Sequence, residues 1–165
     1  MKLSVVVDTE RLMLLGFAMS RTPIHEVRHA PAVLRQAYRH VHTSVYVMDK
    51  AYDAESIHRL IVEDLKAEAF IPARKSSLDV PSGTYRSRVF DRFDPEQYHR
   101  RSAVETTFSI MKRKWGGHLT ARKTRYQQKE MKLKLTVYAL ERLWTIVLLW
   151  SIRPFLQSRS FHFHP

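Results

Sequence analysis

The chain has 165 residues, of which 44% are hydrophobic, which is enough for one folded domain with a buried core. It carries 28 Lys and Arg against 16 Asp and Glu, a formal net charge of +12, and this indicates a polyanionic partner, nucleic acid first and an anionic membrane surface second. It contains no Cys, which excludes a disulfide framework and a thiolate metal site.

The first segment predicts a β-hairpin. Leu3–Val7 alternates and is β-branched, whereas Leu12–Met19 is almost wholly apolar. The polar tetrapeptide between them, Asp8–Arg11, suits a turn. We therefore expect a second strand that is buried on both faces, with Asp8 in the turn.

The next two segments predict a helix and a short buried strand. His25–His40 has helical periodicity, and Pro31 inside it indicates a kink or a late start. Ser44–Met48 is apolar and β-branched, and it ends at Asp49. The residues expected to face inward from the helix are Val27, Val33, Leu34 and Ala37.

A second helix and strand follow. Asp53 stands where a helix over Ala54–Lys66 would need its N-cap. Ala69–Ile71 predicts a further short strand, and Pro72–Pro95 predicts an irregular, basic connection. The apolar stripe of the helix consists of Ile57, Leu60, Ile61 and Leu65, while Glu63 and Asp64 fall on its solvated face.

The last third predicts two helices. Tyr98–Trp115 is helical in pattern and is ended by Gly116 and Gly117. Thr124–Trp150 predicts one long helix or two. Its stripe consists of Leu133, Val137, Leu140, Trp144 and Val147.

The apolar end of this helix has two interpretations. Trp144–Ile152 is shorter than the roughly 20 residues that a membrane span needs, so we expect no membrane partner. We expect these residues to pack in the core, and the alternative is that they form the face of a dimer. The side chains concerned are Trp144, Leu148, Leu149 and Trp150.

Glu105 is the one acid in the basic segment Gln97–Gly117. Ideal helical geometry, about 100° per residue, places it on one narrow stripe with Tyr98, Arg101 and Lys112 at the edge of an apolar face. One interpretation is a weak ion pair with Arg101 one turn away. The other is a metal ligand, because a carboxylate among phosphate-binding cations is repulsive unless a metal ion lies between it and the phosphate.

A metal site needs a second acid, and Asp49 is the candidate because it follows a buried strand. Its simpler interpretation is a turn residue. His25, His42 and His58 share no spacing that would predict a zinc site. The cations in and just after the Glu105 helix predict a phosphate-contacting surface, and they include Arg113, Lys114, Arg122, Lys123 and Arg125.

These motifs resemble those of DDE-type insertion-sequence transposases. The segment Val47–Ile57, a strand that ends in Asp and is followed by a helix, is similar to the second-acid motif of that family. Tyr98, Arg101, Glu105 and Lys112 match the residue types and gaps of its Tyr-Arg-Glu-Lys signature. The resemblance covers nearly the whole chain, from the hairpin to about Trp150.

The resemblance implies an α/β fold of the RNase H-like type, a mixed sheet flanked by helices. It implies that Asp49 and Glu105 bind Mg²⁺ (or Mn²⁺) in catalysis, and that Tyr98, Arg101 and Lys112 contact DNA. The family cleaves DNA at the inverted-repeat ends of its element and joins the 3′ ends to target DNA. A prokaryotic, cytoplasmic, nucleoid-associated protein is therefore expected.

The family has three acids, and the first lies on a strand preceding the hairpin. The printed chain begins too late to include it, so we expect residues 1–152 to be the C-terminal part of a catalytic domain that lacks its first strand, followed by a tail over 153–165. That strand would lie between the hairpin and the Asp49 strand. We expect DNA binding with little or no catalysis by this chain alone.

Two other interpretations stay open. The chain is alternatively a non-catalytic DNA-binding protein that modulates a full-length transposase, in which case Glu105 holds no metal. It is alternatively an oligomerising remnant, acting as a homodimer or as a partner of the full-length protein.

Overall fold

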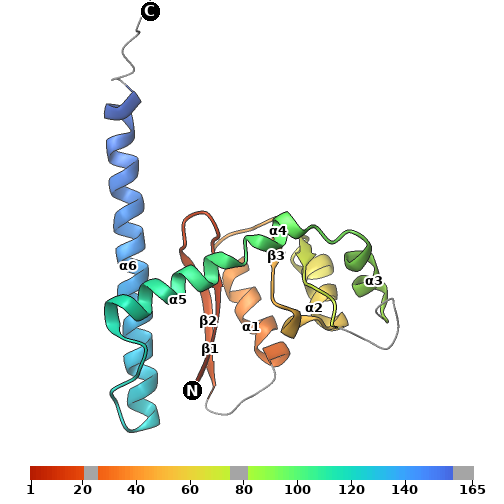
Figure 1. Ribbon diagram of the computed structural model, residues 1–165, viewed down its shortest axis with the longest axis horizontal. Helices are drawn as coiled ribbons and strands as arrows, with labels where there is room; N and C mark the ends of the chain where they lie inside the picture. The colour runs from red at the N-terminus through yellow and green to blue at the C-terminus, as the bar shows by residue number, and fades with distance from the viewer. Residues whose placement is uncertain (21–25, 75–81, 158–165) are drawn as a thin grey trace, which may run out of the picture.

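The computed structural model describes residues 1–20, 26–74 and 82–157 of the chain. Two small sheets and their helices form a layered body, and the long C-terminal helix extends away from one end of it (Figure 1).

The predicted hairpin is present. β1 (Lys2–Val7) pairs antiparallel with β2 (Leu14–Ser20). Asp8 lies in the turn, where its carboxylate accepts the backbone N–H groups of Glu10 at 2.8 Å and Arg11 at 3.1 Å. Burial on its own raises the pKa of Asp8, but these hydrogen bonds and the Arg11 side chain bring it below its ordinary value.

The expectation that the second strand is buried on both faces is wrong. Within β2 only Gly16 and Ser20 are buried, and the other residues are half-exposed. Gly16 is buried because the helix that follows β2 approaches it closely, and a Cβ built on it would lie 2.8 Å from the carbonyl oxygen of Val33. Leu14 and Phe17 are only partly buried and pack against the cluster of Met111, Leu135 and Tyr138.

The helix over this hairpin, α1 (Glu26–Tyr38), matches its predicted range closely. It begins before Pro31 and includes it, which rules out the late start. Three of the four predicted inward residues, Val33, Leu34 and Ala37, are buried. The fourth, Val27, is partly buried and packs against the core. His25, where the prediction began, lies outside the described residues.

The second sheet is parallel. β3 (Val45–Val47) pairs with β4 (Glu68–Phe70), and the chain between them forms the turn η1 (Lys50–Tyr52), α2 (Glu55–Arg59) and the π-helical turn η2 (Leu60–Asp64). The predicted apolar stripe is confirmed, since its four residues are at most 6% exposed; they are Ile57, Leu60, Ile61 and Leu65.

The predicted N-cap at Asp53 is wrong. Ala54 occupies the N-cap position of α2, and the Asp53 carboxylate points to other partners. The predicted solvated face is confirmed, because Glu63 and Asp64 are exposed.

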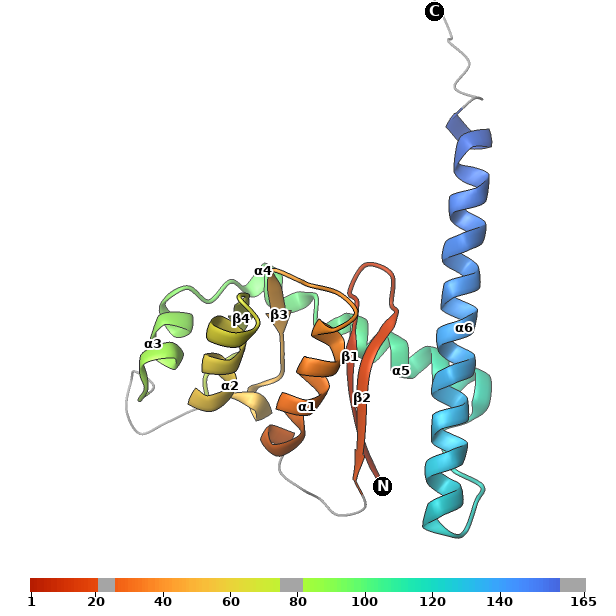
Figure 2. The same ribbon diagram turned by 180° about the vertical axis from the view of Figure 1, so that it is seen from behind.

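An α/β fold with both antiparallel and parallel pairing is therefore present. A single mixed sheet does not form among the described residues. The order is β2–β1 followed, across a gap, by β3–β4, with α1 and α5 on opposite faces (Figures 1 and 2).

The segment predicted as an irregular connection contains a helix, α3 (Thr84–Asp91). The prediction missed this helix because α3 is held by hydrogen bonds to α2, an element that is distant from it in the sequence. The Glu55 carboxylate on α2 accepts the backbone N–H groups of Tyr85 and Arg86, each at 3.1 Å.

The predicted helix over Tyr98–Trp115 is two helices. α4 (Pro95–His99) is capped by Asp94, and α5 (Ser102–Trp115) begins after a turn at Arg100 and Arg101. The predicted end is confirmed, because Gly116 follows α5 with φ +77°.

The long helix α6 (Thr124–Gln157) is single. Its buried anchor is Tyr138, whose hydroxyl donates to the carbonyl oxygen of Leu12 at 2.7 Å and lies 3.3 Å from the hydroxyl of Thr107 on α5. Leu135 and Met111 complete this contact between α6, α5 and the hairpin.

The expectation that the apolar end of α6 packs in the core is wrong. Trp144, Leu148, Leu149 and Trp150 are 64%, 46%, 61% and 75% exposed. This end of α6 extends beyond the body, so no other described element covers it (Figures 1 and 2). By length and composition alone, Thr124–Ile152 also satisfies the requirements of a membrane-crossing helix.

Candidate nucleic-acid and metal site

Asp49 and Glu105 meet at Arg101. Asp49 follows β3, and Glu105 lies in the first turn of α5. Arg101 stands in the turn between α4 and α5, where Nη1 lies 3.7 Å from the Asp49 carboxylate and Nη2 lies 2.6 Å from that of Glu105. The fold therefore brings the two predicted acids to one guanidinium.

Arg101 also contacts Tyr98. Its guanidinium carbon lies 5.7 Å from the centre of the Tyr98 ring, a cation–π contact. The four signature residues do not share one continuous helix, however, because α4 ends at His99 and α5 begins at Ser102. Tyr98 reaches Arg101 across this turn, while Lys112 lies nearer the other end of α5.

Glu105 is more exposed than its predicted position at the edge of an apolar face implied. Its side chain is 62% exposed, against 33% for Arg101 and 47% for Asp49. The predicted ion pair one helical turn apart is present, but at this exposure it contributes little to stability. The arrangement therefore leaves Glu105 accessible for another partner.

The donor chemistry of this site fits a magnesium ion. Carboxylate oxygens are the ligands that Mg²⁺ prefers, and protein sites often supply only one or two of them, with water and phosphate completing the shell. Asp49 and Glu105 supply two such groups, and Arg101 now neutralises them. In the part of the chain that the structure describes, no group of three or more His, Cys, Asp or Glu side chains is placed to hold a metal.

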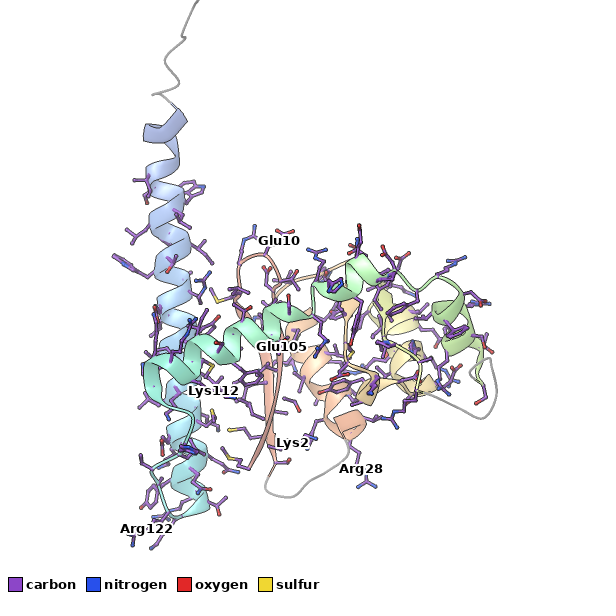
Figure 3. All side chains as sticks on the ribbon, in the orientation of Figure 1. Lys2, Glu10, Arg28, Glu105, Lys112 and Arg122 are labelled. Carbon is purple, nitrogen blue, oxygen red and sulfur yellow. The ribbon has the colours of Figure 1, made fainter. Side chains whose placement is uncertain are left out.

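The predicted DNA-binding cations form two exposed groups, one in the last turn of α5 and one around the start of α6. We call the surface that runs from Glu105 through these two groups the cationic path. Lys112, Arg113 and Lys114 lie in the last turn of α5, and Lys114 pairs with Glu141 on α6. Figure 3 shows Glu105, Lys112 and Arg122 in succession from α5 to the lower end of α6. The path therefore leads from the carboxylates to the start of α6.

The second group is held in place by Glu130, an acid that nothing in the sequence singled out. Glu130 on α6 accepts the backbone N–H groups of Ala121 at 3.0 Å and Thr120 at 3.0 Å. These hydrogen bonds lower the pKa of Glu130, so the carboxylate stays ionised and fixes the segment that carries Arg122 and Lys123.

Arg125 extends this second group at the first turn of α6. Its guanidinium lies 4.6 Å from the ring centre of Tyr126 and donates to the Tyr126 hydroxyl at 2.6 Å. An exposed arginine stacked on an aromatic ring is a surface suited to nucleic acid, because phosphates and bases bind such pairs.

A buried ion pair that the sequence did not reveal joins Asp53, at the end of η1, to Arg86 on α3. Asp53 is 6% exposed and accepts Nε and Nη2 of Arg86 at 2.9 and 2.6 Å, and the backbone N–H of Arg74 at 2.9 Å. The buried His58 ring lies 3.1 Å away. Burial would raise the pKa of Asp53, but these partners lower it overall. The position before Ala54 suggested a helix cap instead.

His58 is neutral in this arrangement. Burial lowers its pKa from the ordinary 6.5, and this outweighs the raising effect of Asp53. The neutral imidazole and the Asp53–Arg86 pair fix α3 to α2, so this cluster is structural support and lies apart from Glu105 in sequence and contacts.

A family model for the transposase DDE domain matches residues 1–140 of the chain. No curated protein and no solved structure matches it.

Proposed function

The chain belongs to the transposase DDE domain family, and we propose that it binds DNA through the exposed cations of α5 and the start of α6, with Asp49 and Glu105 directed at the phosphate backbone. A transposase acts on DNA, so DNA is the substrate that the family implies. The observation that supports this role in the chain itself is the meeting of two carboxylates and Arg101 at the beginning of the cationic path.

The proposed substrate is duplex DNA at the inverted-repeat ends of an insertion sequence, followed by target DNA. Arg113, Lys114, Arg122 and Lys123 would neutralise phosphates along the path, while Arg125 and Tyr126 would present a stacked surface. Tyr98 and Arg101 would contact DNA beside the carboxylates. A cytoplasmic, nucleoid-associated location in a prokaryote is consistent with this substrate.

Asp49 and Glu105 would hold one Mg²⁺ (or Mn²⁺) ion once Arg101 turns to a phosphate. A bound divalent ion would supply Lewis-acid polarisation of a phosphoryl oxygen. Arg101 then has two states, paired with the carboxylates or paired with DNA. The repulsion between carboxylate and phosphate makes the second state dependent on a divalent ion.

We propose that the 165-residue chain does not cleave DNA alone, because two carboxylates meet at Arg101 and DDE chemistry uses three. The RNase H-like arrangement that the family implies is supported by the two sheets, which lie between α1 and α5 on opposite faces. The non-catalytic alternative differs in one respect, since Glu105 would then bind only Arg101.

The test is a binding and nicking assay with a fluorescent duplex. We expect the purified chain to bind the duplex and to leave both strands intact with or without Mg²⁺. Without Mg²⁺, Glu105→Gln should bind at least as well as wild type, since it removes one repulsive charge. Mg²⁺-dependent nicking by wild type that disappears in Glu105→Gln would overturn the proposed inactivity.

We further propose that the chain forms a homodimer through α6. Leu133, Val137, Leu140, Trp144 and Val147 repeat at alternating spacings of four and three, the heptad pattern of a coiled coil. Each is between 39% and 64% exposed. A second copy of α6 offers the same stripe and would cover it.

A further inference from the structure

The exposed stripe of α6 lies on the side of the helix that faces away from the body. Leu135 and Tyr138 pack against the hairpin and α5 and are at most 3% exposed, whereas Leu140, in the middle of the stripe, is 60% exposed. At about 100° per residue, Leu140 is about 140° around the helix from Leu135 and about 160° from Tyr138. A second helix can therefore lie along the stripe without displacing the body.

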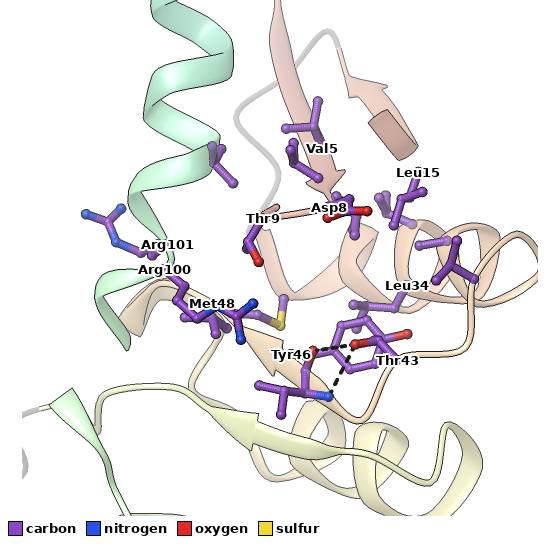
Figure 4. A pocket seen from close by; sticks show the side chains of 18 of the residues that line it. Val5, Asp8, Thr9, Leu15, Leu34, Thr43, Tyr46, Met48, Arg100 and Arg101 are labelled. Carbon is purple, nitrogen blue, oxygen red and sulfur yellow. Dashed lines mark hydrogen bonds between the residues drawn. The ribbon is translucent and has the colours of Figure 1, made fainter. Parts of the chain in front are cut away.

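A helix in this position also leaves the Arg101 site open. Arg100 and Arg101 line a cavity of about 580 Å³ between β1 and β3, and the hairpin lies between this cavity and α6 (Figures 2 and 4). A partner on the far side of α6 does not reach the cavity. Pairing through the stripe is therefore compatible with the proposed contact between Arg101 and DNA.

The charges of α6 are concentrated at its start. Residues 124–134 carry one acid and four cations, which are Arg125, Lys129, Lys132 and Lys134, whereas residues 143–152 carry no charged side chain. The acid, Glu130, pairs with Lys134 at 3.3 Å and offsets one of the cations. Two parallel copies of α6 would bring the cations of both starts together. Two antiparallel copies would instead place each charged start beside an uncharged end, which avoids this repulsion.

The sizes of the stripe residues favour the same arrangement. In a parallel pair each residue of the stripe faces its own copy, so two Trp144 rings would meet across the seam and crowd it. In an antiparallel pair centred on Arg142, Leu140 faces Trp144 of the partner subunit, and Val137 faces the partner's Val147. This centre gives every stripe residue from Val137 to Val147 an apolar partner, and it sets the large ring opposite a smaller side chain.

We infer that the second copy of α6 lies antiparallel to the first and is centred on Arg142. Each uncharged end then covers the partner's stripe, and the two charged starts lie at opposite ends of the pair. The cationic path of each copy stays open to DNA, because the other copy's path is at the far end. This inference rests on the homodimer proposed above and adds its orientation and its register.

The test uses disulfide cross-linking, because the sequence contains no Cys that could compete. Val137→Cys and Val147→Cys are conservative changes within the stripe. In the antiparallel pair, two copies of the same cysteine lie ten residues apart along the axis, roughly 15 Å, and a disulfide spans at most about 7 Å between Cα atoms. We expect an equimolar mixture of the two variants, one with a size tag, to give at least about tenfold more covalent dimer on mild oxidation than either variant alone.

A parallel pair gives the opposite pattern, in which each variant alone forms a covalent dimer, and this would overturn the inference. Sedimentation velocity of the wild-type chain separates this result from a failure of the homodimer proposal. A monomeric wild type would overturn both. A wild-type dimer whose variants form no disulfide, alone or mixed, would overturn only the orientation and register.

A spin label outside the stripe gives a second measurement that leaves the seam intact. Lys132→Cys is at an exposed position and carries the label. In the antiparallel pair the two labelled positions lie twenty residues apart along the axis, roughly 30 Å, whereas in a parallel pair they lie side by side on helices whose axes are about 10 Å apart. Double electron–electron resonance distinguishes the two, and the short distance would overturn the inference.

Discussion

Asp49 and Glu105 lie on different elements, yet they contact the two terminal nitrogens of one guanidinium, that of Arg101. An arginine between two carboxylates satisfies both charges without a metal ion. Other partners can compete for these groups. A divalent cation can replace the guanidinium beside the carboxylates, and a phosphate can replace the carboxylates beside the guanidinium.

Removing the competing charge should strengthen divalent-ion binding. In Arg101→Ala, the two carboxylates lose their shared partner and repel each other until a cation binds. We expect a larger Mg²⁺-dependent rise in melting temperature for Arg101→Ala than for wild type, measured by scanning fluorimetry. The rise should vanish in Asp49→Asn and in Glu105→Gln. A rise that persists in both would place the ion elsewhere.

The cations at the start of α6 should carry much of the DNA affinity. Replacing Arg122, Lys123 and Arg125 with Ala should lower the slope of log affinity against log salt by roughly two to three, since each phosphate contact releases counterions. Duplex binding by anisotropy at several salt concentrations measures this.

The matched control removes three exposed cations of the other region, Arg28, Arg39 and Arg59. Arg28 lies on the far side of the hairpin from Arg122 (Figure 3). We expect the control to retain most of the salt slope. Equal losses in both triple variants would show that net charge alone, without a defined path, determines binding.

Stability should fall on mild acidification because of His58. Its folded-state pKa is below 6.5, so the unfolded chain takes up this proton first and the stabilisation is lost as pH falls below about 6.5. The pKa of Asp53 is lowered from 3.8, so its contribution persists until the pH falls further. The groups facing His58 are Asp53, Arg86 and Glu55.

We therefore expect the melting temperature to drop between pH 7 and pH 5 in wild type and to drop less in His58→Gln, which does not titrate. His40→Gln, at an exposed position, is the control and should follow wild type. If His58→Gln shows the full drop, another group controls the transition.

Tyr138 should hold α6 to the body. Tyr138→Phe removes a buried hydroxyl and leaves the carbonyl of Leu12 and the hydroxyl of Thr107 without it, which should cost about 1 to 2 kcal/mol of unfolding free energy. Urea denaturation measures this. Tyr126→Phe, at a 42%-exposed position, should change stability by much less.

The exposed stripe of α6 should control self-association. Sedimentation velocity should show a dimer for wild type and a folded monomer for Leu140→Glu, because a charge in a coiled-coil seam is strongly unfavourable. Thr136→Glu, which is exposed but outside the stripe, should remain dimeric. A monomeric wild type that floats with anionic vesicles would instead favour a membrane contact for α6.

The local elements follow from the order of neighbouring residues along the chain. Alternation predicted the hairpin, and the spacing of Ile57, Leu60, Ile61 and Leu65 predicted the buried face after β3, because strand and helix periods are properties of neighbouring residues. Asp8 in its turn and Gly116 after α5 were likewise predictable from short-range backbone chemistry. The signature residues around Glu105 predicted the family that the comparison confirms.

Contacts between groups that are distant in the sequence depend on how the elements pack in three dimensions. Asp53 binds Arg86 and leaves its helix uncapped, α3 forms because Glu55 holds its first turn, and Arg101 joins Asp49 to Glu105. The apolar end of α6 is exposed because the body ends before the helix does. These outcomes depend on where separate elements pack, and the period of a single segment carries no information about its neighbours in space.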